Sequence, residues 1–184
     1  MIQLEGATWQ DYLRLLEVRG DRSAPRISYL EGRLEIMSPS RDHEVIKSLI
    51  GCLVETYCLH AGVRFSPYGS WTLKDERNQR GAEPDECYIF GDQDADRPHL
   101  AIEVLWTSGR LDKLDVYRKL GVGEVWYWEK GRIRVYVLVD EEYEERPRSQ
   151  ALPEIDLDLL VAHLDRPTAY DAIHDFRAAL SRQG

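Results

Sequence analysis

The sequence predicts one mixed α/β (α+β) domain, and three observations carry this prediction. Apolar runs of strand length lie before, between and after two stretches with helical spacing, so helices and strands are interspersed along the chain. One run, HLAIEVL at positions 99–105, is apolar enough to form a buried central strand. The chain has 184 residues, 43% of them hydrophobic, which suffices for one substantial core but hardly for two.

The first forty residues predict a helix followed by a β-hairpin. Residues 8–20 carry apolar side chains at helical spacing, with Thr8 in position to cap the N-terminus. Two strands, at 27–30 and 34–37, are joined by a tight glycine turn. We expect the helix to pack against the sheet.

A longer helix is predicted over residues 42–60, because its apolar side chains recur in pairs that form one continuous face. Either Ser40 or Asp42 can cap its N-terminus. Short strands are predicted at 63–65 and 70–73, and the polar stretch KDERNQRG that follows them predicts a loop.

The middle of the chain predicts a mixed sheet. Strands at 86–90 and 99–105 come first, a helix over 111–120 follows, and strands at 124–128 and 133–139 form a hairpin over a Lys-Gly turn. Strands on both sides of a helix allow parallel as well as antiparallel pairing.

The C-terminal part begins with the acidic run DEEYEE at 140–145, which predicts a solvated loop and strand edge, and ends in a helix over 168–183. Within the single domain we therefore expect three parts. These are an N-terminal helix and hairpin (1–40), a central core (41–139), and an acidic loop with a C-terminal helical extension (140–184).

Composition excludes several classes of protein. The net charge of −9 argues against a general nucleic-acid coat protein, whose affinity for phosphate comes from Lys and Arg, but it is compatible with a metal site built from carboxylates. No segment is long and apolar enough to span a membrane, so we expect no membrane partner and a cytoplasmic location. The cysteines Cys52, Cys58 and Cys87 lack metal-binding spacing and are expected as small buried hydrophobes.

Two carboxylates are the strongest candidates for chemistry. Asp85 follows a proline at the start of one predicted strand, and Glu103 lies inside the apolar strand 99–105, where an unpaired carboxylate costs several kcal/mol. Acids on neighbouring strands can hold Mg²⁺ or Mn²⁺, which polarises a phosphodiester and activates water. For Glu103 alone, a structural role paired with an arginine or a helix N-terminus is an equal alternative.

A positive group near such a site would stabilise the negative charge that develops during hydrolysis. Lys113 begins the helix after the strand of Glu103, and its long side chain can reach back toward the carboxyl end of the sheet. The alternative is a solvent-facing lysine paired with an acidic neighbour.

Several stretches together resemble the Uma2 family, which is grouped with restriction-endonuclease-like folds. They are YLEGRLEIMSPSRDHE, GAEPDECYIFG, AIEVLWTSGRLDKLDVYRKLGV and GEVWYW, within residues 29–139. The resemblance implies a PD-(D/E)XK nuclease core, in which Pro84-Asp85 matches the PD element and Glu103 the second acid. Leu105 stands where the in-strand lysine of the motif usually lies, and Lys113 matches the displaced lysine of the family.

The start of the long helix adds another candidate. His43 and Glu44 match the SPS-x-x-H-E stretch of the family, in a class whose first helix often contributes to the metal site. Helical spacing places His43 beside the apolar edge and Glu44 on the polar side, so we select His43, with a core-edge histidine as an equal alternative.

Weaker candidates have structural explanations that are at least as good. Glu35 alternates with apolar neighbours and could equally face solvent, Tyr117 could bound the cleft or simply pack, and Thr107 and Ser108 could cap the next helix or touch phosphate. The triplet at 126–128 is expected in the core or an interface rather than as a base-stacking platform.

These observations predict a metal-dependent endonuclease that hydrolyses DNA phosphodiester bonds, with Asp85 and Glu103 as ligands of Mg²⁺ or Mn²⁺ and with no organic cofactor. One alternative is a non-catalytic binding module with a nuclease fold. Another is a Mg²⁺-dependent phosphodiesterase that acts on a smaller substrate. A homodimer is compatible with the fold, since such nucleases commonly pair to cut both strands, and surplus aromatic residues could line its interface: Trp106, Trp126, Trp128 and Tyr136.

Overall fold

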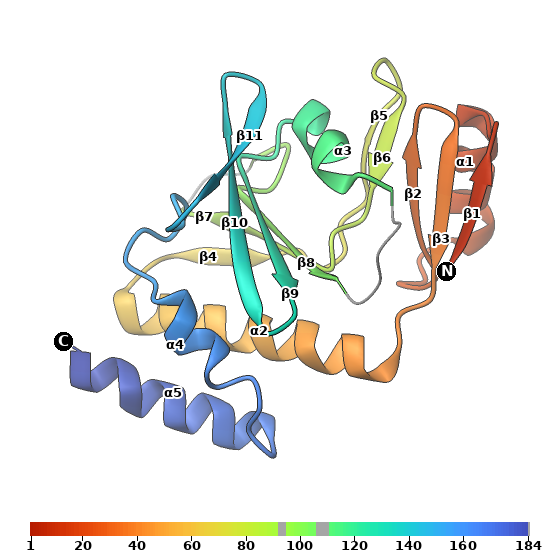
Figure 1. Cartoon of the computed structure of the whole chain (residues 1–184). Helices are drawn as coiled ribbons and strands as arrows, with labels where there is room; N and C mark the ends of the chain where they lie inside the picture. The colour runs from red at the N-terminus through yellow and green to blue at the C-terminus, as the bar shows by residue number, and fades with distance from the viewer. Residues whose placement is uncertain (92–94, 106–110, 184) are drawn as a thin grey trace.

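The structure of the chain is a computed structural model that describes residues 1–91, 95–105 and 111–183. Figure 1 shows two β-sheets and five helices in this described part of the chain. Helix α3 (Lys113–Leu120) contacts strands of both sheets, so it lies where the two sheets meet. This junction positions the candidate site.

The first sheet has five antiparallel strands in the order β1-β3-β2-β6-β5. Its strands are β1 (Ile2–Glu5), β2 (Arg26–Leu30), β3 (Arg33–Met37), β5 (Leu73–Asp75) and β6 (Arg80–Ala82). Helix α1 (Trp9–Arg19) packs on β2. As predicted, Thr8 caps it: its hydroxyl accepts from the backbone N–H of Asp11 at 3.1 Å, and the Asp11 carboxylate accepts in return at 2.9 Å.

The second sheet has six strands in the order β11-β10-β9-β8-β7-β4. Its strands are β4 (Phe65–Pro67), β7 (Glu86–Phe90), β8 (Leu100–Leu105), β9 (Glu124–Glu129), β10 (Arg132–Val139) and β11 (Glu142–Arg146). Strands β8 and β9 run parallel, and the other pairs are antiparallel. A parallel pair needs a crossover connection, and α3 lies in that connection.

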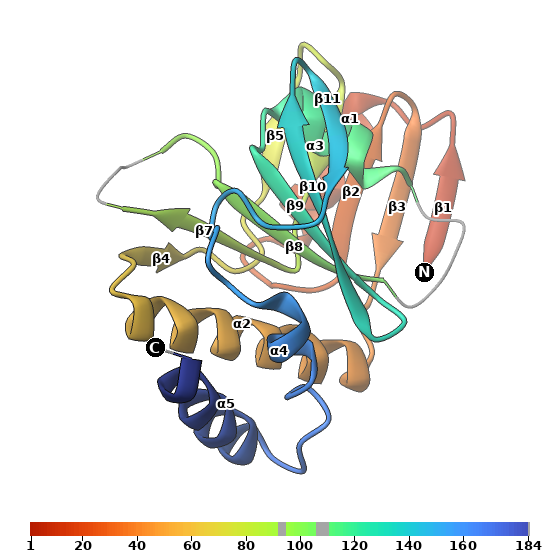
Figure 2. The ribbon, with the colours of Figure 1, turned by 60° about the vertical axis from the view of Figure 1, so that its left-hand side comes forward.

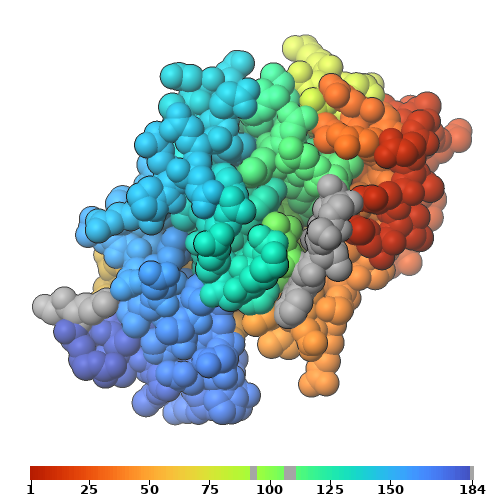
Figure 3. Space-filling model, viewed as in Figure 1, coloured from red at the N-terminus to blue at the C-terminus, as the bar shows by residue number. Residues whose placement is uncertain are grey.

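Helix α2 (Arg41–Ala61) covers one face of the six-stranded sheet, and the C-terminal segment packs against both α2 and strand β10. In Figures 1 and 2, α4 (Leu157–Val161) and α5 (Ala169–Gln183) lie against α2 on the side away from the other sheet. The space-filling view shows the C-terminal segment in blue and the N-terminal sheet in red at opposite ends of the molecule (Figure 3). The main core fills the layer between α2 and the sheet.

The predicted fold class is confirmed, but the strands divide into two sheets rather than one. The predicted loop KDERNQRG overlaps the end of β5 and the start of β6. The periodicity missed β1 and β6, and β11 extends the acidic run that was predicted as a loop and strand edge. All three are short or polar, and each is a strand because it pairs with a neighbour. Strands β4 and β5 begin two or three residues later than predicted, and they join different sheets.

Among the helices of the described chain, we find none that combines the length and the apolar character needed to cross a membrane.

Candidate active site

The two predicted carboxylates belong to neighbouring segments of the six-stranded sheet, Asp85 just before β7 and Glu103 within β8. Strands β7 and β8 pair with Glu86 opposite Ile102, and the backbone N–H of Asp85 donates to the carbonyl of Ile102 at 3.1 Å. Asp85 directly precedes β7, and its bond to Ile102 places it beside the part of β8 that carries Glu103. Both residues are 0% exposed. Such burial requires that each carboxylate be neutralised by its neighbours.

Three groups from three elements hold Asp85. The backbone N–H of Val104 donates to its Oδ2 at 2.7 Å, and Nε2 of His43 lies 3.0 Å from the same oxygen. The guanidinium of Arg26, on β2, forms an ion pair with Oδ1 through Nη1. The Asp85 carboxylate therefore joins the six-stranded sheet to the first sheet and to the N-terminus of α2.

Helix α3 supplies the partners of Glu103. The Lys113 ammonium lies 2.7 Å from both carboxylate oxygens, and the hydroxyl of Tyr117, one turn later, donates to Oε1. The helix begins where Asp112 accepts from two backbone N–H groups, which orients its first turn. Lys113 is 4% exposed, so the solvent-facing alternative for it is wrong.

Tyrosine hydroxyls beside Glu103 remain protonated at neutral pH. Burial and the nearby Glu103 carboxylate raise the pKa of Tyr117 well above its ordinary value of 10.0. The same two causes raise the pKa of Tyr127, which pairs with Glu103 in the parallel register of β8 and β9. Tyr117 is therefore a permanent hydrogen-bond donor to Glu103.

Helix α2 supplies His43 and Glu44, which differ in their exposure and in the group that each contacts. His43 is buried against Asp85, whereas the Glu44 side chain is 42% exposed and lies 3.3 Å from Nη2 of Arg26. Burial alone would raise the pKa of Glu44, but Lys47, Arg26 and His43 together lower it below its ordinary value. Glu44 is therefore ionised at neutral pH and balances part of the Arg26 charge.

Glu35 also faces inward. It is buried, and its Oε2 accepts from the backbone N–H of Leu111 at 3.1 Å and from the Gln3 amide at 3.3 Å. The solvent-facing alternative for Glu35 is wrong. Its carboxylate instead fixes the segment that leads into α3, and this places Lys113.

Sequence reasoning missed two charged residues of this region, Arg26 and Glu83. The Glu83 carboxylate accepts from the backbone N–H of Ile27 at 3.0 Å and pairs with Arg19, and so it joins α1 to the strands that carry the site. Alternation offered a signal for both. Arg26 alternates with Ile27 in β2 and so takes the opposite face of that strand. Glu83 stands two residues before Asp85, the spacing at which extended chain presents side chains to the same side.

Other candidates lie apart from the pair or outside the described residues. Thr107, Ser108 and Trp106 fall outside the described ranges. The remaining aromatic residues proposed for a dimer interface are buried in the chain's own core, so they give a dimer no support: Trp126, Trp128 and Tyr136. The triplet at 126–128 is core in its two tryptophans, as expected.

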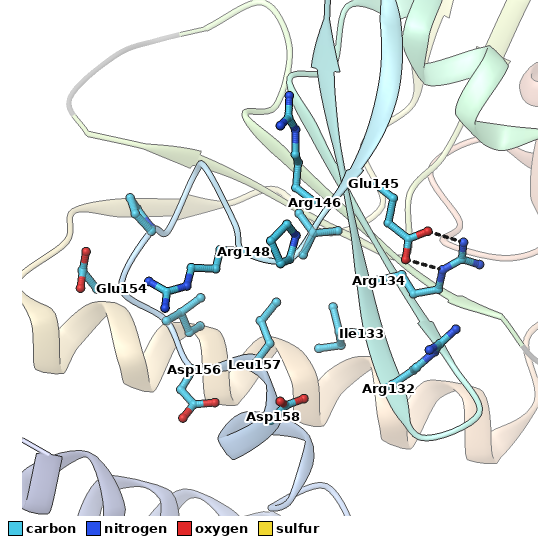
Figure 4. Close-up of a pocket in the computed structure, with 14 residues that line it drawn as sticks. Arg132, Ile133, Arg134, Glu145, Arg146, Arg148, Glu154, Asp156, Leu157 and Asp158 are labelled. Carbon is cyan, nitrogen blue, oxygen red and sulfur yellow. Dashed lines mark hydrogen bonds and ion pairs between the residues drawn. The ribbon is translucent and has the colours of Figure 1, made fainter.

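An open hollow of about 520 Å³ lies elsewhere, between the β10–β11 hairpin and α4 (Figure 4). No predicted site residue lines it. At its edge, Arg134 binds Glu145 through contacts of 3.1 and 2.6 Å, and the lining holds acidic and basic side chains in equal number. The formal charges of the lining residues therefore sum to zero.

The Asp85–Glu103 pair suits Mg²⁺ or Mn²⁺ in the type of its ligands. Mg²⁺ prefers oxygen and is commonly held by one or two carboxylates together with waters. A carboxylate offers about four acceptor positions, and each of these two uses three. One position thus remains on each. The described residues contain no cluster of three or more His, Cys, Asp or Glu side chains arranged for a metal, so waters or substrate would complete the coordination.

The fold and the family match together define a restriction endonuclease-like protein. A model of the Uma2 family, described as "Putative restriction endonuclease", matches residues 9–169, and the chain belongs to this family. The crystal structure of "a putative nuclease belonging to DUF820" from Anabaena variabilis has a similar fold, with a TM-score of 0.53. Its sequence is 15% identical, over 95% of this chain and 99% of that chain. A comparison with curated proteins gives no match.

Proposed function

We propose that the protein is a metal-dependent endonuclease of the PD-(D/E)XK type that hydrolyses DNA phosphodiester bonds. One observation carries the proposal: Asp85 and Glu103 are two fully buried carboxylates on neighbouring segments of one sheet, and the Lys113 ammonium contacts Glu103. Family membership and the nuclease fold support it. A cytoplasmic location, a single domain and a homodimer remain predictions.

Each residue has a defined part in this proposal. Asp85 and Glu103 hold Mg²⁺ or Mn²⁺, which when bound polarises the phosphodiester and makes water a stronger nucleophile. Lys113 places a fixed positive charge beside the phosphate, where negative charge develops during attack. His43 acts as a positioning residue, because its Nε2 lies 3.0 Å from Asp85 and restrains that carboxylate.

The decisive experiment compares cleavage of plasmid DNA by the wild type and by Glu103→Ala in the presence of Mn²⁺. We expect the variant to lose metal-dependent cleavage while its circular dichroism spectrum stays native. Glu86→Gln is the matched control, because Glu86 directly follows Asp85 but pairs with Lys47, which is not a proposed site residue. Cleavage that persists in Glu103→Ala would overturn the assignment.

A second candidate is a non-catalytic binding module. It is favoured by the positively charged side chains that already neutralise both carboxylates. Asp85 already has Arg26 as a counter-charge, and Glu103 already has Lys113. Calorimetric titration with Mn²⁺ separates the two, since a module of this kind binds no metal at millimolar concentration. The net charge of −9 keeps a smaller phosphodiester open as substrate, so the assay includes single-stranded DNA, RNA and a chromogenic phosphodiester.

A further inference from the structure

Arg26 lies where two carboxylates meet. Its side chain is buried, with Nη1 on Oδ1 of Asp85 and Nη2 3.3 Å from Oε1 of Glu44. The guanidinium thus contacts Asp85, which is fully buried, and Glu44, which is half-exposed. Glu44 can therefore accept Arg26 if the guanidinium leaves Asp85.

The two oxygens of Asp85 are not equivalent. Oδ2 takes the backbone N–H of Val104 and lies 3.0 Å from Nε2 of His43, so it has two partners. Oδ1 contacts the side chain of Arg26, which projects from the first sheet. The remaining acceptor position of Asp85 is thus on Oδ1, so a cation that binds there meets the oxygen that Arg26 already neutralises.

We propose that Arg26 is a positioning residue that serves as the internal counter-cation of Asp85 and that a divalent cation must displace from Oδ1. This inference rests on the proposed metal-dependent function. Without metal, Arg26 keeps a buried carboxylate from being left uncompensated, which would cost several kcal/mol. With metal, two cations cannot share that oxygen without strong repulsion, and the Arg26 guanidinium turns fully to Glu44.

Glu44 is suited to receive the guanidinium. It is already within ion-pair distance, it remains ionised at neutral pH, and Lys47 holds it from the other side at 3.2 Å. The exchange therefore needs a small rotation of one side chain and no movement of a strand. It makes the apparent metal affinity depend on Arg26 and Glu44, which contribute no ligand.

The test is Mn²⁺ binding by calorimetry, together with thermal unfolding with and without Mn²⁺. Arg26→Gln removes the competing cation, and we expect it to bind Mn²⁺ about tenfold more tightly than the wild type. Without metal its melting temperature should fall, and Mn²⁺ should raise that temperature more than it does for the wild type. A purely structural arginine would not produce tighter binding.

Glu44→Gln keeps the test valid if Arg26→Gln does not fold, because Glu44 is half-exposed. This variant removes the charged acceptor for the displaced guanidinium, so we expect weaker Mn²⁺ binding, by severalfold. Lys47→Met is the matched control. It removes a nearby positive charge that touches no ligand, and it should change Mn²⁺ affinity less than Arg26→Gln does.

The outcomes separate this inference from the function on which it rests. If the wild type binds Mn²⁺ and neither Arg26→Gln nor Glu44→Gln changes the affinity, the role of Arg26 is overturned and the metal site stands. If Lys47→Met tightens binding as much as Arg26→Gln does, the effect is general electrostatics and the role of Arg26 is also overturned. If neither the wild type nor Arg26→Gln binds Mn²⁺ at millimolar concentration, the metal site itself fails and the exchange fails with it.

Discussion

Glu103 and Lys113 neutralise each other inside the protein. Both are buried, so water cannot solvate either charge in place of its partner. The Lys113 ammonium is 2.7 Å from both Glu103 oxygens, and Tyr117 adds a hydrogen bond whose proton stays in place because its pKa is raised. The stability of the folded protein therefore depends on both members being present together. Losing one member leaves a buried charge, whereas losing both leaves none.

This reasoning predicts strong coupling between the two residues in the free energy of unfolding. Lys113→Met should cost about 3–5 kcal/mol, because Glu103 is then buried without its cation. The double variant Lys113→Met/Glu103→Gln should lose clearly less than the sum of the two single losses. Urea unfolding of all four proteins measures the coupling. Additive losses would show that water or another cation replaces the missing partner.

Helix α1 is held on the first sheet by close contact between an aromatic ring of the helix and a glycine of a strand. Tyr12 is fully buried and packs against Trp9 and Tyr29. Gly81, on β6, leaves the space that the Tyr12 ring fills, since a methyl group there would collide with the ring. The glycine thus sets how closely α1 approaches the strands that carry Arg26.

We therefore predict that Gly81→Ala lowers the free energy of unfolding by about 1–3 kcal/mol, as overpacking of a filled core does. Gly123→Ala is the matched control, because a methyl group there meets the carbonyl of His99 at an ordinary 3.5 Å. Chemical denaturation of both variants compares them. Equal stability of Gly81→Ala and the wild type would mean that α1 shifts freely on the sheet.

The C-terminal segment is attached to the sheet through another buried acid, Glu124 on β9. Its carboxylate accepts from the Ser149 hydroxyl at 2.6 Å and from the backbone N–H groups of Gln150 and Ala151 at 2.6 and 2.9 Å. These bonds place the chain where it turns toward α4 and α5. The acidic segment before them is partly ordered as β11, which pairs with β10.

At the scale of the whole molecule, burial of thiols links stability to alkaline pH. Burial raises the pKa of Cys58 to about 11 and that of Cys87 to about 12, above the ordinary value of 9.0. The unfolded chain therefore loses these protons near pH 9, while the folded protein keeps them. Because the folded state binds more protons in this range, its stability is full below pH 9 and declines as the pH rises toward 11 and 12.

We accordingly expect the urea midpoint to fall steadily above pH 9, and the double variant Cys58→Ala/Cys87→Ala to have a shallower decline than the wild type. The difference should be clearest just above pH 9, before the tyrosines of the unfolded chain ionise. Unfolding curves at several alkaline pH values measure it. Parallel declines in both proteins would place the effect on other groups.

Local pattern was enough to predict the fold class, the helices that carry the site, and Asp85, Glu103 and Lys113 as candidates, whereas His43 came from the resemblance to the Uma2 family. Capping residues and apolar periodicity act over a few positions, and a lone acid in an apolar strand is visible without any structure. Tertiary structure alone decided that the strands form two sheets and that Arg26 meets Asp85 between them. The physical reason is that periodicity tells which face of a strand a side chain takes. Packing between segments distant in the sequence decides which charged residue that side chain then contacts.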